Sequence, residues 1–88
     1  MSKQEKLLER LLKQPKDFTW DELETLMAGY NYKINKKGKT SGSRRRFQNE
    51  DSEQALTLHK PHPRNVLKPY QVKEVIDFLI EINAIKRE

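Results

Sequence analysis

KTSGSRRRFQNEDSEQALTLHKPHP, residues 39–63, is the stretch that decides the fold. It contains two runs with the composition of β-strands, Gly42–Gln48 and Gln54–His59, separated by the polar run Asn49–Ser52. Two such runs joined by a short polar segment predict a β-hairpin. The same stretch holds both histidines of the chain and three consecutive arginines. We therefore expect the hairpin to carry the side chains that decide function.

Side-chain alternation limits how the two strands of this hairpin can pair. Phe47 and Leu56 are large apolar residues, so both should face the core. If Phe47 lies opposite Leu56, then Arg44 lies opposite His59 on the other face, where directly opposite residues have Cβ atoms about 5 Å apart. The same register turns Arg45 inward, so its long side chain must reach the sheet edge or be redirected by a bulge. The pattern therefore predicts an arginine and a histidine side by side on an exposed face.

The residues before the hairpin predict two helices and a short strand. Over residues 3–13 the leucines form one apolar stripe among charged residues, which is typical of an amphipathic helix. Thr19 and Glu22 have the spacing of a capping box, which begins a second, short helix. Gly29 is well placed to end that helix in a left-handed conformation. Alternating side chains over residues 30–34 then predict the first strand.

The residues after the hairpin predict one more helix and complete the fold. Pro69 suits the first turn of a helix, and apolar residues recur at helical spacing from Val72 to Ile80. The order helix, helix, three strands, helix predicts an α+β fold of two layers, a three-stranded antiparallel sheet with the helices on one face. The other face is open to solvent or to a ligand. We expect residues 1–88 to form a single domain with Trp20 in its core.

The charge of the chain favours a polyanionic partner. The formal net charge is +5, and the pI is about 9.6. Acidic residues are absent from 30–48 and from 56–73, so the bases of these segments predict a positively charged patch, the usual electrostatic signature of nucleic-acid binding. The alternative is a lysine-rich surface that serves only solubility. Segment 30–48 holds seven bases, Lys33, Lys36, Lys37, Lys39, Arg44, Arg45 and Arg46.

Composition also excludes several classes of protein. The chain has no cysteine, which excludes disulfides and zinc sites built on thiolates. The N-terminal residues are charged and lead into an amphipathic stretch, and no apolar run is long enough to span a bilayer. We therefore expect a cytoplasmic protein without a membrane segment. The two histidines have no carboxylate at metal-ligand spacing, so we expect no metal and no cofactor.

The predicted pair on the exposed face suggests a specific chemistry. Histidine is the side chain whose unperturbed pKa lies nearest neutrality, so it suits general acid–base catalysis. Arginine stabilises charge that develops on a phosphate. Cleavage of RNA by its own 2′-hydroxyl needs these groups and no metal, and His59 or His62 with Arg44 supplies them. The alternative is that the histidines beside the proline-rich bend only pack or cap, while the arginines bind phosphate.

The hairpin and the last helix together resemble the HicA toxin family. The resemblance rests on Gly42-Ser43 opening a strand that runs to Phe47, on LHKPHP at residues 58–63, and on the helical segment 70–85. HicA proteins are the mRNA interferases of HicA–HicB toxin–antitoxin pairs. The resemblance implies a fold similar to a double-stranded-RNA-binding domain. It also implies a HicB-like antitoxin that covers the basic face.

One position departs from the family pattern. In the family the Gly-Ser pair is usually followed by a catalytic histidine, and here that position is Arg44. The histidine of the family's His-Pro element matches His62. We therefore expect His59 to be the acid–base group, assisted by Arg44 and His62. The expected RNA-binding residues are Lys33, Lys36, Lys37, Lys39, Gly42, Ser43, Arg45, Arg46 and Lys60.

Two other classes of function remain open at this point. One is a non-catalytic RNA- or DNA-binding module of the same fold, which the loss of the family histidine at Arg44 favours. The other is an interaction protein whose basic face docks an acidic partner. The predicted meeting of Arg44 and His59 favours the ribonuclease over both.

Overall fold

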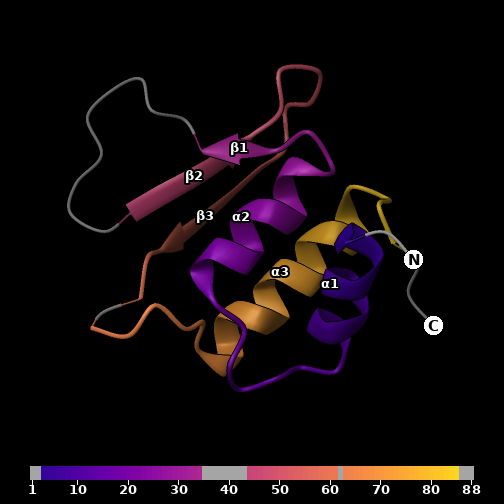
Figure 1. Ribbon diagram of the computed structural model, residues 1–88. Coiled ribbons are helices and arrows are strands. Elements are labelled where there is room, and N and C mark those ends of the chain that lie inside the picture. Colours follow the sequence, from indigo (N-terminus) through magenta and orange to yellow (C-terminus); the bar gives the residue numbers. More distant parts are fainter. Residues whose placement is uncertain (1–2, 35–43, 62, 86–88) are drawn as a thin grey trace.

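The computed structural model describes residues 3–34, 44–61 and 63–85 (Figure 1). Within these residues the chain forms three helices and three strands in the predicted order, which confirms the α+β fold. The elements are α1 (Lys3–Leu12), α2 (Trp20–Ala28), β1 (Lys33–Ile34), β2 (Arg44–Gln48), β3 (Ala55–His59) and α3 (Pro69–Glu81).

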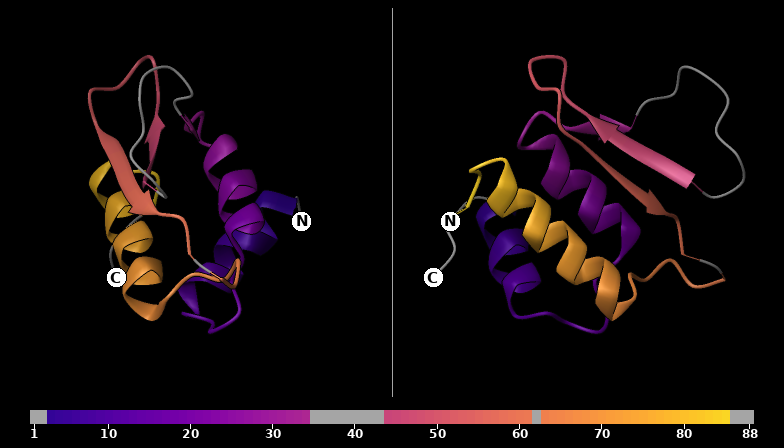
Figure 2. Two further views of the ribbon diagram at one scale, coloured as in Figure 1. Left: turned by 90° about the vertical axis from the view of Figure 1, so that its left-hand side faces the viewer. Right: turned by 180° about the vertical axis from the view of Figure 1, so that it is seen from behind.

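The molecule has two layers, a sheet and a group of helices on one of its faces (Figures 1 and 2). In the described part of the chain the strands are antiparallel and follow the order β1-β2-β3, so β3 forms one edge. α2 packs against β1 and α3 against β3, while α1 contacts both of these helices on the side away from the sheet. Among the described residues, no helix covers the other face of β2 and β3.

The register of β2 and β3 is the predicted one. Phe47 lies opposite Leu56, and Arg44 lies opposite His59. Phe47 and Leu56 are buried, whereas Arg44 and His59 are exposed, as the alternation of side chains along a strand requires. Apolar burial on one face therefore fixes which polar residues meet on the other.

Aromatic side chains join the sheet to the helices. Trp20 and Phe47 are almost completely buried, and their ring centroids are 5.7 Å apart. Tyr32 meets Phe78 edge to face at 5.3 Å. Such pairs add about 0.5–1.5 kcal/mol beyond the area that they bury. Trp20 is thus a core residue, as expected, and β2 is held directly against α2.

The start of α2 matches the sequence prediction, but its end does not. The backbone N–H of Glu22 donates to Thr19 Oγ1 at 3.1 Å, and the Thr19 N–H donates to Glu22 Oε1 at 3.0 Å, which completes the capping box. Gly29, however, has φ −65°, so the left-handed assignment is wrong. Asn31 takes the left-handed conformation instead, with φ 67°.

The true end of α2 also explains why β1 is shorter than predicted. The Tyr32 N–H donates to Met27 O at 2.9 Å, and the Asn31 N–H donates to Ala28 O at 3.0 Å. These two bonds form a Schellman motif, in which asparagine can replace glycine as the left-handed residue. The chain before Tyr32 is used to close the helix, so the strand begins at Lys33 and not at residue 30.

Gly29 has a different role, which follows from a tertiary contact. A Cβ at this position would overlap the side-chain amide of Gln4. Gln4 Nε2 donates to Leu26 O at 3.3 Å near the end of α2. The glycine therefore makes room for α1 to hydrogen-bond to α2.

No helix in the described residues is long and apolar enough to cross a membrane.

Candidate nucleic-acid interface

The candidate site lies where β2 begins and β3 ends, on the face that none of the described helices covers. Arg44 pairs with His59 across the strands, and Arg46 pairs with Thr57 one step further along the same face. Both arginines and the histidine are exposed. Opposite residues in an antiparallel pair have Cβ atoms about 5 Å apart. A guanidinium and an imidazole can therefore contact one phosphate group together.

Arg45 lies on the inward side of β2, opposite Leu58, as the register predicted. It is half-buried, and its Nη1 donates to the Arg44 backbone oxygen at 3.0 Å. The guanidinium therefore turns back to the strand, and the side chain does not share the face of Arg44 and His59. Arg45 therefore differs from the RNA-binding candidates Arg44 and Arg46, which both lie on the open face.

A buried amide lies directly behind the candidate site. The backbone oxygen of His59 accepts a hydrogen bond of 2.8 Å from Gln71 Nε2. Gln71 belongs to the first turn of α3, and Gln71 Oε1 accepts from the Lys68 N–H at 3.0 Å. Gln71 was not among the site residues predicted from the sequence. The available signal was a glutamine three residues after the N-cap of a helix, on the same stripe as the buried Val75.

The first turn of α3 extends the basic surface beside the end of β3. Lys68 is exposed, and Tyr70 is 55% exposed, although it is aromatic. Lys60 follows His59 directly and is half-buried. Lys33 is exposed on β1, opposite Gln48, so it shares the open face of the sheet at its other end.

Several predicted site residues cannot be placed. Of the RNA-binding candidates, Lys36, Lys37, Lys39, Gly42 and Ser43 lie outside the described residues, and so does His62. Within residues 3–34, 44–61 and 63–85, no three metal-ligating side chains lie together.

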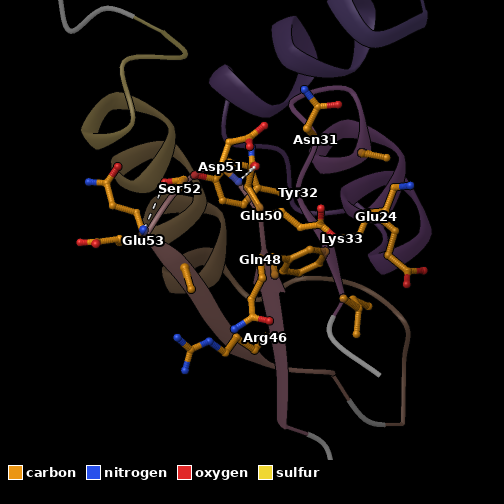
Figure 3. A pocket seen from close by; sticks show the side chains of 16 residues that line it. Glu24, Asn31, Tyr32, Lys33, Arg46, Gln48, Glu50, Asp51, Ser52 and Glu53 are labelled. Atoms are coloured by element: carbon orange, nitrogen blue, oxygen red, sulfur yellow. Dashed lines mark hydrogen bonds between the residues drawn. The ribbon is translucent and has the colours of Figure 1, made fainter. Parts of the chain in front are cut away.

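The turn end of the hairpin carries a groove, which is distinct from the Arg44–His59 pair. This open groove of about 1090 Å³ runs along β1, the far part of β2 and the hairpin turn. Figure 3 shows Glu50, Asp51 and Glu53 at the turn, with Arg46 further along the strand. The lining also includes Lys33 and Arg46, but the carboxylates of Glu24, Glu50, Asp51 and Glu53 outnumber these two bases. Because carboxylates repel a phosphate, the turn end of the groove is a poor site for a nucleic-acid backbone.

A comparison with protein families matches most of the chain to a known family. The family model described as HicA toxin of bacterial toxin–antitoxin matches residues 20–81. The matched span begins at the first residue of α2 and ends at the last residue of α3, so it contains the sheet and the helix behind His59. No curated protein and no solved structure matches the chain.

Proposed function

The chain belongs to the HicA toxin family of bacterial toxin–antitoxin systems, and we propose that it binds and cleaves mRNA by metal-independent acid–base chemistry. The observation that carries this proposal is the pairing of Arg44 with His59 on the exposed face of the sheet. It brings a phosphate-binding group and a proton-transfer group to one place.

The proposed reaction uses the 2′-hydroxyl of the RNA as the nucleophile. His59 removes the 2′ proton, the 2′ oxygen attacks the adjacent phosphorus, and the bond from phosphorus to the 5′ oxygen breaks. The leaving oxygen takes up a proton, for which His62 is the candidate acid. Arg44 stabilises the charge that builds up on the non-bridging oxygens. The products are a 2′,3′-cyclic phosphate and a 5′-hydroxyl.

The departure from the family pattern is compatible with this reaction. The family's catalytic histidine position is Arg44 here, and the register places a histidine directly across from it. The imidazole then comes from the neighbouring strand, while the guanidinium occupies the family position. A histidine on β2 or on β3 can reach the same phosphate, because positions 44 and 59 lie opposite each other and face the same side of the sheet.

The surrounding bases support binding of the RNA backbone. Arg46 and Lys33 lie on the same face as the pair, and Lys60 follows it. Exposed Tyr70 offers a surface on which an unpaired base can stack, which favours single-stranded RNA. Further proposed contacts are Lys36, Lys37, Lys39, Gly42, Ser43 and Arg45.

The family also implies an antitoxin partner. We propose a HicB-like protein that covers the basic face and thereby blocks RNA. We further propose that residues 1–88 act as one domain in the cytoplasm, where mRNA is available.

A non-catalytic RNA- or DNA-binding module is the second candidate. It is favoured by Arg44, which replaces the histidine that the family usually has. Such a module needs the arginines and no proton transfer, so it predicts tight, salt-sensitive binding without cleavage. An interaction protein likewise needs no proton transfer, and it would bind an acidic protein in preference to RNA.

Cleavage of a long single-stranded RNA in EDTA separates these functions. We expect wild type to cleave, and His59→Ala to lose roughly 100-fold or more of the rate, the typical contribution of a general acid–base group. Binding by His59→Ala should stay within about threefold, because the arginines remain. Arg44→Ala should weaken binding by less than about tenfold, because the other bases remain, and should also lower the rate of cleavage. Binding without cleavage by wild type would favour the module, and binding to neither RNA nor DNA would favour the interaction protein.

A further inference from the structure

Gln71 is the buried polar side chain among the residues that the structure describes, at 2% exposure. Both ends of its amide are used. Oε1 accepts from the Lys68 N–H at 3.0 Å, and Nε2 donates to the His59 oxygen at 2.8 Å. A buried amide with both ends satisfied is a rigid link. It joins the first turn of α3 to the last residue of β3.

Capping of α3 alone does not explain a glutamine at this position. Capping needs only an acceptor for the Lys68 N–H, which glutamate at the third helical position also supplies. The bond to His59 O needs a donor, which an ionised carboxylate lacks. The amide is therefore matched to the second contact, which spans 12 positions of the sequence.

The second contact lies where the sheet needs support. His59 is the last residue of β3, and in the described residues β3 pairs with β2 on one side only. An edge strand that ends here would fray at its final residue. Gln71 holds the His59 carbonyl from the helix side.

The start of α3, which carries Gln71, is attached to the core. The Leu67 N–H donates to Phe18 O at 2.8 Å, and the Trp20 N–H donates to Asn65 O at 3.0 Å. These bonds tie the segment before α3 to the segment before α2, and Phe18, Trp20 and Leu67 are all buried. The start of α3, which carries Gln71, is therefore anchored to the core.

We propose that Gln71 is a positioning residue, which holds the backbone of His59 so that the imidazole stays aligned with Arg44 and a bound phosphate. This inference rests on the proposed ribonuclease function. Proton transfer requires hydrogen-bond distance to the reacting oxygen, and a misplacement of about 1 Å can cost on the order of 100-fold in rate. Binding of the RNA backbone by several cations is far less sensitive to such a shift.

Three variants test this role. Gln71→Met keeps the length of the side chain and removes both hydrogen bonds. Gln71→Glu keeps the acceptor for Lys68 and, when ionised, lacks the donor for His59. Asn83→Ala is the control. It strains the left-handed residue at the opposite end of α3, where φ is 62°, and it lies far from His59 along the helix.

The readouts are kcat and KM on a defined single-stranded RNA, the melting temperature, and the His59 ring signals in ¹H–¹³C NMR spectra. We expect both Gln71 variants to lower kcat about 10- to 100-fold, with KM within about twofold and shifted His59 signals. Asn83→Ala, compared at a similar loss of melting temperature, should leave kcat and the His59 signals unchanged. Equal effects from all three variants would overturn the proposal, because they would show a role in stability alone.

The NMR measurement separates this proposal from the proposed function. If wild type cleaves no RNA, the ribonuclease assignment fails, and the His59 signals still report whether Gln71 holds the histidine. Shifted signals in the Gln71 variants, with unchanged signals in Asn83→Ala, support the positioning role. Unchanged signals in all variants overturn it, whatever the activity.

Discussion

The two ends of the β2–β3 hairpin carry opposite charges on the same pair of strands. At one end Arg44 faces His59. At the other, the turn presents Glu50 and Asp51, both exposed. Arg44 and Gln48 are four strand steps apart, roughly 13 Å at about 3.3 Å per residue. That exceeds the Debye length of about 10 Å at 0.1 M salt, so each end acts electrostatically on its own.

The shape of the surface and its charge indicate different places for a ligand. The groove lies at the acidic end, whereas the residues suited to phosphate chemistry lie on an open face at the basic end. A polyanion selects by charge, and a long flexible RNA needs no enclosed pocket. The basic end is therefore the better candidate, and the following variants test the contrast between the two ends.

The largest expected effect comes from removing Phe47, the core residue on which both ends of the hairpin depend. Phe47→Ala should destabilise the protein by about 3–5 kcal/mol, the usual cost of deleting a buried phenylalanine. Phe47 is 1% exposed and contacts the ring of Trp20. Urea denaturation followed by tryptophan fluorescence measures the loss. A change below about 1 kcal/mol would contradict the register, since Phe47 would then lie outside the core.

The next effect concerns the basic end alone. Arg44→Glu should lower the affinity for single-stranded RNA roughly tenfold and reduce the slope of log K against log salt by about 0.7 for each lost phosphate contact. Fluorescence anisotropy at several salt concentrations measures both quantities. The melting temperature should change little, because the side chain is exposed. An unchanged salt slope would place the RNA elsewhere.

The matched change at the acidic end should be smaller. Asp51→Lys shifts the net charge by the same amount as Arg44→Glu, with the opposite sign, at an exposed turn residue. We expect RNA affinity to change by less than about threefold at 0.15 M salt, because screening acts over about 8 Å. A gain comparable with the loss in Arg44→Glu would show that RNA also follows the turn.

The smallest expected effect on RNA affinity comes from changes in backbone geometry near the acidic end. Asn31→Gly should change stability by less than about 0.5 kcal/mol, since glycine also adopts the left-handed conformation freely. Asn31→Ala should cost about 1–2 kcal/mol because its Cβ strains a residue with φ 67°. RNA affinity should be equal in both variants. Thermal denaturation and anisotropy on the same samples check this pair.

The register could be predicted from the sequence because few alternatives existed. Phe47 and Leu56 had to share the buried face, and parity then placed Arg44 opposite His59. The capping box of Thr19 and Glu22 could also be predicted, because it involves residues only three positions apart. By contrast, Gly29 was misassigned because its role depends on Gln4, which is 25 positions away in the sequence. A rule based on neighbouring residues had no access to that contact.

The candidate site was predicted only in part, for the same physical reason. Strand parity brings Arg44, Arg46 and His59 to one face, so these three residues were accessible from the sequence. Gln71 was missed because its importance comes from a hydrogen bond to the backbone of a distant residue. The inward turn of Arg45 followed from parity. Its bond to the backbone oxygen of Arg44 did not.

Exchange of the cross-strand pair tests the central claim most directly. The variant Arg44→His combined with His59→Arg returns a histidine to the family position and moves the guanidinium to β3. If the two residues act as one unit, this double variant should cleave single-stranded RNA in EDTA within about tenfold of wild type. His59→Ala should fall roughly 100-fold or more below wild type. A folded double variant that cleaves no faster than His59→Ala, beside an active wild type, would contradict the shared role of the pair.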